Sequence, residues 1–318
     1  MATDSNAYQN PRTDFPAQAG NAATGDVQLD IGKLVWVAAM LLGGTVGSAI
    51  TATPGAVAMF LVFTATTLCL GHSLGMHRRF IHRSYDCPRW LEYLFVHLGV
   101  LVGLAGPLGM LRTHDTRDWA QRQRECHDYF GHGQPWYRDA WWQLVCSIEL
   151  ASPPEIRIEA DIAADPVYDW MERTWLWQQL PWALLLFTVG GWAWVFWGIC
   201  SRVTVSIFGH WLVGYFAHNR GEQRWQVAGA AVQGYNLPWF ALLTMGESWH
   251  NNHHAFPGSA RLGHDPSQWD PGWWVLAGLQ RIGLVTNLMT PELITDRTDL
   301  MPTDIAPRRL ARSDEPTT

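Results

Sequence analysis

The sequence is poor in charged residues and in cysteine. Asp, Glu, Lys and Arg make up 16% of the 318 residues, while 48% are hydrophobic and 20 are Trp, a composition unlike that of an ordinary soluble enzyme. The five cysteines are scattered and form no C-x-x-C pair, so neither a disulfide framework nor a thiolate zinc site is indicated. A net charge of −6 argues against nucleic acid as a partner, because phosphate binding requires clustered basic groups.

Modules for carrying electrons are also missing from the sequence. It has no H-P-G-G cytochrome b5 signature, no Gly-rich dinucleotide-binding loop and no ferredoxin cysteine set. If the chain catalyses a redox reaction, its electrons must therefore come from another protein.

Apolar runs predict four membrane-crossing helices arranged as two hairpins, at about residues 32–72 and 174–213. Each run is about long enough to cross a ~30 Å hydrocarbon core as a helix. The first pair is linked by the uncharged segment Thr51–Gly55, and the second pair is divided by Gly190-Gly191. The sequence thus predicts an all-α integral membrane protein of the cell inner (plasma) membrane.

The rest of the central region is predicted to form a cytoplasmic cap, from residues 73–173 and 214–293. The basic residues that follow the first hairpin place its open end in the cytoplasm by the positive-inside rule; they are Arg78, Arg79, Arg83 and Arg89. Trp90–Leu111 is apolar but interrupted by Gly and Pro, so we expect an interfacial or re-entrant helix. Residues 1–28 are predicted to be disordered, and residues 294–318 to form a charged, solvated tail.

Three closely spaced histidines, His250, His253 and His254, stand at positions i, i+3 and i+4. On a helix this spacing puts all three rings over one face, which predicts metal ligation. No Cys lies near them and other histidines form further clusters, which favours iron over a closed zinc site. His77 and His82 form a second cluster; because residues five apart do not stack on an α-helix, we expect a helix end that continues into a turn. We assign His72 to a hydrogen-bonded wall and His97 to packing.

The His-x-x-His-His spacing, with Gly246-Glu247 before it, two Asn within it and Phe256-Pro257 after it, resembles the third histidine box of the membrane-bound fatty acid desaturases. The bacterial acyl-CoA desaturase type is the most similar. The likeness continues from Ser259-Ala260-Arg261 through Gln268 to Asp270–Trp273, and it covers most of residues 30 to 290. His77 and His82 resemble the first box. His210 resembles an additional metal histidine that precedes the third box by about forty residues.

The second box departs from the family pattern. The relatives have H-R-x-H-H where this chain has Arg112-Thr113-His114-Asp115-Thr116-Arg117-Asp118. His114 and Asp118 share a helix face, and a carboxylate is a competent iron ligand, so we expect both to bind metal. Arg117 has no acceptor and cannot.

Several assignments around this box stay open. Asp118 could instead pair with Arg117 or Arg112. Asp115, His127 and His132 are reserve ligands. His218 is left undecided, and His264 is assigned to the surface or to the surroundings of the metal.

The resemblance implies a desaturase domain over residues 29–293. It implies an O2-dependent enzyme that introduces a cis double bond into a fatty acyl chain, linked to CoA or to a lipid, at two non-haem irons. The electron donor would be an external ferredoxin or a cytochrome b5 type protein with its reductase. The implied metal ligands are His77, His82, His114, Asp118, His210, His250, His253 and His254.

Three alternatives remain at this point. One is the same iron chemistry ending in hydroxylation of an acyl chain or hydrocarbon. Another is a diverged metal-binding membrane protein without catalysis. A zinc-dependent membrane hydrolase is disfavoured, because the box lacks the general-base Glu of H-E-x-x-H.

Overall fold

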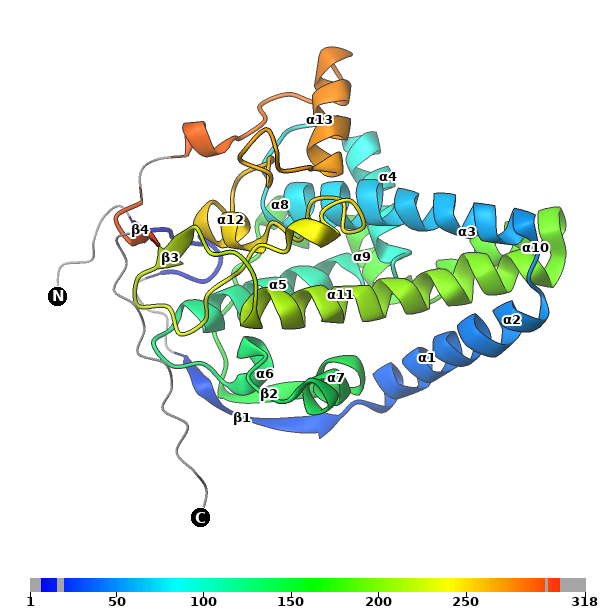
Figure 1. The fold of residues 1–318 in the computed structure, drawn as a ribbon, viewed down its shortest axis with the longest axis horizontal. Helices are drawn as coiled ribbons and strands as arrows, with labels where there is room; N and C mark the ends of the chain where they lie inside the picture. Colours follow the sequence, from blue (N-terminus) through cyan, green and yellow to red (C-terminus); the bar gives the residue numbers. More distant parts are fainter. Residues whose placement is uncertain (1–6, 16–19, 295–296, 304–318) are drawn as a thin grey trace.

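The computed structural model describes residues 7–15, 20–294 and 297–303, and it is predominantly helical (Figure 1). The longer helical elements are α1 (Ile31–Leu42), α3 (Pro54–Thr66), η2 (Thr67–Ile81), α4 (Arg89–Val100), α5 (Pro107–Arg122), α7 (Trp136–Val145), α9 (Pro166–Thr174), α10 (Gln179–Val195), α11 (Arg202–Asn219) and α13 (Pro271–Arg281). The shorter ones are η1 (Gly43–Gly47), α2 (Ser48–Ile50), α6 (Asp128–Gly131), α8 (Ala160–Ala163), η3 (Phe196–Ser201), η4 (Pro238–Phe240), α12 (His250–Ala255) and η5 (Pro291–Leu293).

Three stretches of the described chain are long and apolar enough to cross a membrane: Ile31–Ile50, Pro54–Ile81 and Gln179–Asn219. The first two are joined at Thr51–Thr53, as the sequence predicts. In Figure 1 this connection lies at the right, whereas α12 and the strand β4 (Leu300–Pro302) lie at the left. The 12-residue α4 is too short to cross a membrane as a helix and is not among the three stretches.

The stretch Gln179–Asn219 is not one straight helix. Gly191 has φ 63° and ψ −157°, outside the helical region, a conformation that glycine tolerates. Arg202 donates a hydrogen bond to Gln179 Oε1 at 2.6 Å, although the two residues are 23 positions apart. On a straight helix that separation would be ~35 Å, so the chain folds back at Gly191.

The π-helical segment η2 continues α3 out of the apolar stretch and carries His72 and His77. Its hydrogen bonds run from residue i+5 to residue i, so residues five apart stack; the last of these runs from His82 N to His77 O at 3.0 Å. The expected helix end that continues into a turn is confirmed, since η2 ends at Ile81 and His82 is its C-cap, but the helix is π-helical and not α-helical there. Gly71 and Gly75 let η2 approach α4 closely, because a Cβ on either would lie within 2.4 Å of α4 backbone atoms.

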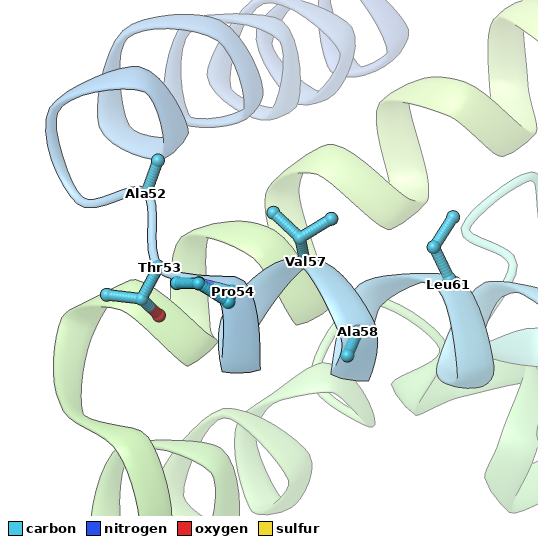
Figure 2. A pocket seen from close by; sticks show the side chains of 6 residues that line it. All are labelled: Ala52, Thr53, Pro54, Val57, Ala58 and Leu61. Carbon is cyan, nitrogen blue, oxygen red and sulfur yellow. The ribbon is translucent and has the colours of Figure 1, made fainter.

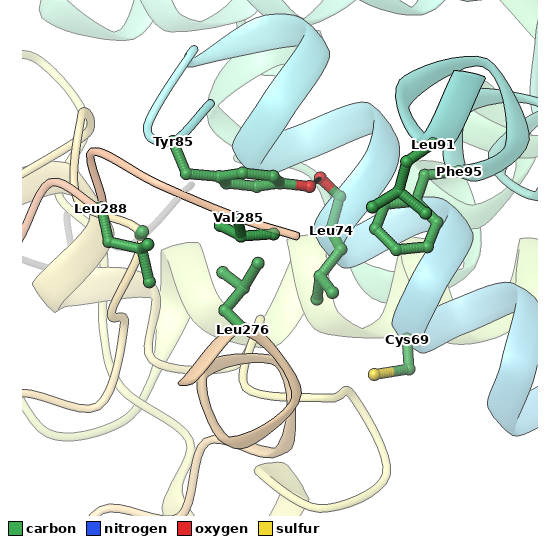
Figure 3. Close-up of a cluster of buried hydrophobic side chains, with 9 residues drawn as sticks. Cys69, Leu74, Tyr85, Leu91, Phe95, Leu276, Val285 and Leu288 are labelled. Atoms are coloured by element: carbon green, nitrogen blue, oxygen red, sulfur yellow. Dashed lines mark hydrogen bonds between the residues drawn. The ribbon is translucent and has the colours of Figure 1, made fainter. Parts of the chain in front are cut away.

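An apolar core fixes the open end of η2 against the cap (Figure 3). Leu74 from η2 and Phe95 from α4 meet Leu276 from α13 in this cluster. Tyr85 is 1% exposed and donates its hydroxyl to Leu74 O at 3.0 Å, so its one polar atom is satisfied inside the core. This cluster joins segments about 200 residues apart in the sequence and fixes where His77 lies.

A shallow apolar hollow lies at the opposite end of the molecule (Figure 2). It is lined by residues of the connection between the first two apolar stretches and the start of α3, which are Ala52, Thr53, Pro54, Val57, Ala58 and Leu61. None of these side chains is ionisable, so the hollow offers no group for acid–base or metal chemistry.

The all-α prediction is wrong in part, because the structure contains two small antiparallel sheets. β1 (Asn21–Leu29) pairs with β2 (Cys146–Ser152), and β3 (Trp225–Val227) pairs with β4 (Leu300–Pro302). Most of β1 lies in the segment predicted to be disordered, and β4 lies in the predicted solvated tail. Both predictions fail there because strand partners far away in the sequence supply the hydrogen bonds. Of these two segments, residues 1–6, 16–19, 295–296 and 304–318 lie outside the described residues.

Candidate metal centre

Seven histidines form two adjacent groups at the cap end of the apolar stretches. One group is His77, His82, His114 and His253; the other is His218, His250 and His254. Within each group the candidate ligand atoms lie within 4.8 Å of one another. The two groups adjoin, since the ring centroids of His250 and His253 are 5.8 Å apart. Imidazole nitrogens at these distances can share a bound metal ion.

α12 carries three of these histidines, and it divides them between the groups. His253 faces His77, with ring centroids 4.6 Å apart, whereas His250 Nε2 and His254 Nε2 lie 3.0 Å from each other. The helix is confirmed and the three ring centroids lie within 6.0 Å of one another, but the rings divide between the two groups. Positions i and i+4 stay together here, while i+3 turns toward η2.

The two Asn residues between these histidines fix the short helix. Asn251 accepts hydrogen bonds from the backbone of Arg224 and Trp225 and donates to Gly234 O at 2.8 Å. Asn252 donates to Leu262 O and to Gln268 Oε1, and it is 1% exposed. Amide side chains can donate and accept at the same time. A six-residue helix is therefore held in place from several directions.

Carboxylates orient two of the rings in the first group. His77 Nδ1 lies 2.6 Å from Glu247 Oε2, and His114 Nδ1 lies 3.2 Å from Asp115 Oδ1. A carboxylate on one ring nitrogen fixes the tautomer and leaves the other nitrogen for a metal. His114 Nε2 indeed points into the group, 3.3 Å from His82 Nε2.

Burial favours the neutral form of several of these imidazoles, and neighbouring groups favour the charged form of Glu247. Burial lowers the pKa of His82, His250 and His253 well below the usual value, and it lowers the pKa of His254 to about 4. Neutral imidazole is the form that binds metal. Burial would raise the pKa of Glu247, but the neighbouring His77 and Arg78 lower it well below its usual range.

Similarity to known proteins identifies the family of this chain. Residues 51–262, about two thirds of the chain, match the fatty acid desaturase family. The chain belongs to the fatty acid desaturase family. It is 36% identical to an sn-1 stearoyl-lipid 9-desaturase of Anabaena variabilis, over 73% of this chain and 84% of that protein.

Other desaturases give similar matches. The chain is 31% identical to an sn-2 palmitoyl-lipid 9-desaturase of Nostoc sp. (strain 36), over 70% of this chain and 77% of that protein. It is 30% identical to the acyl-CoA 5-desaturase AL21 of Anemone leveillei, over 76% and 74% respectively. The chain is therefore a desaturase and an oxidoreductase, as the sequence predicts. The names of these relatives support desaturation and not the hydroxylation alternative.

The structure brings His218 of this desaturase, and not His210, into the metal groups. His218 Nδ1 donates to Gly214 O at 2.7 Å, and His218 Nε2 lies 3.0 Å from His250 Nε2. His210 stands two turns earlier on α11, where its ring packs against His72 with centroids 5.2 Å apart. The prediction of His210 as a ligand is thus not supported by this geometry. His72 Nδ1 is buried and has no hydrogen-bond partner among the described residues, contrary to the expected hydrogen-bonded wall.

The altered second box contributes His114 alone. Asp118 belongs to neither group and instead accepts a hydrogen bond from Arg122 Nε at 3.2 Å, so its partner is neither Arg117 nor Arg112. The reason is that Arg122, one helical turn further along α5, offers the carboxylate a charge partner. Arg117 contacts His132 instead, with 2.7 Å between its Nη1 and His132 Nε2.

The reserve ligands have other partners. His132 is engaged at both ring nitrogens, by Arg117 and by Asp139. His127 caps α6 by accepting from Tyr129 N at 3.1 Å. Asp115 is completely buried and orients His114. His97, which was assigned to packing, contacts Gln178 and Trp182.

Sequence reasoning missed two arginines near the centre. Arg297, in the predicted tail, donates to His254 O at 2.9 Å and to Ala255 O at 2.7 Å, the last carbonyls of α12. Arg12, in the segment predicted to be disordered, contacts Asp115 at 3.2 Å. No motif marks either residue, because both act through contacts made across the fold.

Proposed function

We propose that this desaturase uses O2 to introduce a cis double bond into a fatty acyl chain at two non-haem iron ions, one for each histidine group. The observation that supports this most directly is the meeting of imidazoles from η2, α5, α11 and α12 at the cap end of the apolar stretches. Such a position lets a membrane-derived acyl chain reach the metal without crossing water.

The donor set suits iron. All seven grouped ligands are imidazoles, with no thiolate among them, and imidazole is a good ligand for iron. His253 Nδ1 is buried without a hydrogen-bond partner among the described residues, which is costly unless the ring has another role such as metal binding. When bound, the iron would supply the O2 activation needed to remove hydrogen from an unactivated methylene.

The protein's own groups would orient and shield this centre. Glu247 and Asp115 hold His77 and His114 in single tautomers. Arg78, which is 1% exposed, joins η2 to α13 through Asp270 at 2.8 Å and keeps the first box rigid. The apolar stretches and the core of Figure 3 exclude water from one side of the site.

We further propose four membrane crossings in two hairpins, with the cap in the cytoplasm and the chain in the inner membrane. The reversal at Gly191 supports the division of Gln179–Asn219 into two crossings. The arginines at the end of η2 favour a cytoplasmic position for the cap. Electrons would then reach it from a cytoplasmic ferredoxin, or from a cytochrome b5 type protein with its reductase.

The acyl carrier is a lipid or CoA, since the relatives described above include desaturases of both kinds. To test this, the chain would be expressed in bacteria whose membranes contain only saturated acyl chains, with a His253→Ala variant as control. We expect new cis-unsaturated chains with the parent alone, detected by gas chromatography of fatty acid methyl esters. Pulse labelling separates the two carriers, because the label becomes unsaturated either as acyl-CoA or only after transfer to lipid. Unchanged fatty acids with a metal-loaded protein would refute the proposal.

A further inference from the structure

A segment outside the region matched by the desaturase family packs directly against the metal centre. Residues 7–15 precede the matched region 51–262 by about 40 positions. Even so, Asn10, Arg12 and Thr13 are only 4%, 5% and 0% exposed. Burial of this degree shows that the segment is an integral part of the cap.

The contacts of Arg12 lead to both of the first two histidine boxes. Its Nη1 donates to Ile81 O at 2.8 Å, at the end of η2 and next to His82. The same nitrogen lies 3.2 Å from Asp115 Oδ2, on α5. The Nε atom donates to Glu159 Oε2 at 2.8 Å, which supplies a second carboxylate.

Asp115 transmits this contact to a grouped histidine. Its two oxygens are divided, since Oδ2 faces Arg12 while Oδ1 lies 3.2 Å from His114 Nδ1. The carboxylate is 0% exposed, so no solvent competes for either oxygen. The orientation of the His114 ring therefore depends on a carboxylate whose other side is held by Arg12.

We propose that Arg12 is a positioning residue of the metal centre, which holds His82 and His114 in register through Ile81 O and Asp115. The planar guanidinium can serve these acceptors together, which an ammonium group cannot do in the same geometry. Without Arg12, Asp115 would be a buried charge with only His114 beside it, and the ring would lose its fixed partner. This inference rests on the metal centre of the proposed function.

Further contacts tie the segment to the surroundings of the site. Asp14 pairs with Arg122 at 2.6 Å, and Arg122 in turn pairs with Asp118. Tyr8 N donates to Asp299 Oδ1 at 3.4 Å, and Asp299 is the partner of Arg297. Residues before and after the family region thus meet over the same site.

The test compares metal binding by the full-length protein and by Arg12→Ala, Arg12→Lys and Asp115→Asn variants. Arg173→Ala is the control, because the Arg173 side chain is 76% exposed and pairs with Asp169 at the surface. Each purified apoprotein would be titrated with Co(II), and the visible ligand-field spectrum would report the geometry. We expect ~10- to 100-fold weaker binding and an altered spectrum for Arg12→Ala, the range typical of lost partners behind metal ligands. Arg12→Lys should restore the binding only in part.

A double variant separates positioning from a purely structural role. If Arg12 acts through Asp115, the losses in Arg12→Ala and Asp115→Asn should not add in the double variant. A lowered melting temperature of Arg12→Ala with unchanged Co(II) affinity and spectrum would overturn the inference, as would additive losses. If Arg12→Ala does not fold, Arg12→Lys against Asp115→Asn gives the same comparison. Absence of Co(II) binding in the parent would instead refute the metal centre itself.

Discussion

Mutation can test whether His218 or His210 is a metal ligand. The sequence predicted His210 as a metal ligand, but the structure places His218 in a histidine group instead. Replacing His218 by Ala removes one of the three imidazoles of the second group, whereas replacing His210 by Ala removes a ring that contacts His72 outside both groups. We expect the His218→Ala protein to keep one metal and lose most of the other. The His210→Ala protein should keep both.

The size of the effect follows from how many ligands share the binding free energy. A four-ligand zinc site yields ~10–16 kcal/mol, or about 3 kcal/mol for each ligand. On that scale, losing His218 would weaken the second site ~100-fold, at about 1.4 kcal/mol for each factor of ten. Iron(II) binds less tightly than zinc to such ligands, so the weakened site should empty during purification.

The assay is metal content by mass spectrometry after purification, followed by competition with a chelator of known affinity. His210→Ala is the matched control, since both residues lie on α11 and both changes shorten an imidazole to a methyl group. Loss of iron from His210→Ala together with full occupancy in His218→Ala would refute the grouping described here.

Three further predictions concern Asp118, Arg297 and His264. Asp118→Asn should retain its metal, because Asp118 pairs with Arg122 outside both groups; a halved metal content would contradict this. Arg297→Ala should destabilise the protein by ~2 kcal/mol, since a charged donor to two carbonyls of α12 is lost, and the melting temperature should fall by several degrees, less so in Arg297→Lys. Burial, aided by Arg261, lowers the pKa of His264 from 6.5 to about 4. The unfolded chain therefore gains a proton below pH 6.5 while the folded protein stays neutral at this position, and the stability contributed by the neutral ring is lost from about pH 6.5 down to pH 4. In the His264→Leu variant, the free energy of unfolding should fall by ~2 kcal/mol less between pH 7 and pH 5 than in the parent. An unchanged pH profile of thermal melting would rule this out.

Local patterns predicted much of this molecule. The spacing of His250, His253 and His254 indicated the helix and a group of histidines that could hold a metal, because ligand spacing on a single element is encoded locally. Hydrophobic runs located the three apolar stretches, and Gly190-Gly191 marked the place where the chain folds back. The reaction, desaturation of a fatty acyl chain, was predicted from the resemblance to the desaturase family.

Contacts across the fold were beyond these patterns. His210 and His218 are on the same helix, and only the position of α12 shows which ring meets His250. Asp118 could accept from several arginines of nearby sequence, and tertiary packing favoured Arg122. Arg12 and Arg297 stand in polar segments whose composition suggested solvent exposure. In the structure, Arg12 contacts the buried carboxylate of Asp115, and Arg297 donates to the carbonyl of Ala255 in α12.

The π-helical hydrogen-bond pattern of η2 makes the length of this stretch as important as its composition. Every residue along η2 contributes to the offset between the apolar part of the helix and the first histidine box. Removing a single residue would shift and rotate everything beyond it along the helix, so that His77 would lose its contact with His253 of α12. A gain or loss of one residue in η2 would therefore misalign the apolar stretch and the histidine groups, even if every side chain suited its new position.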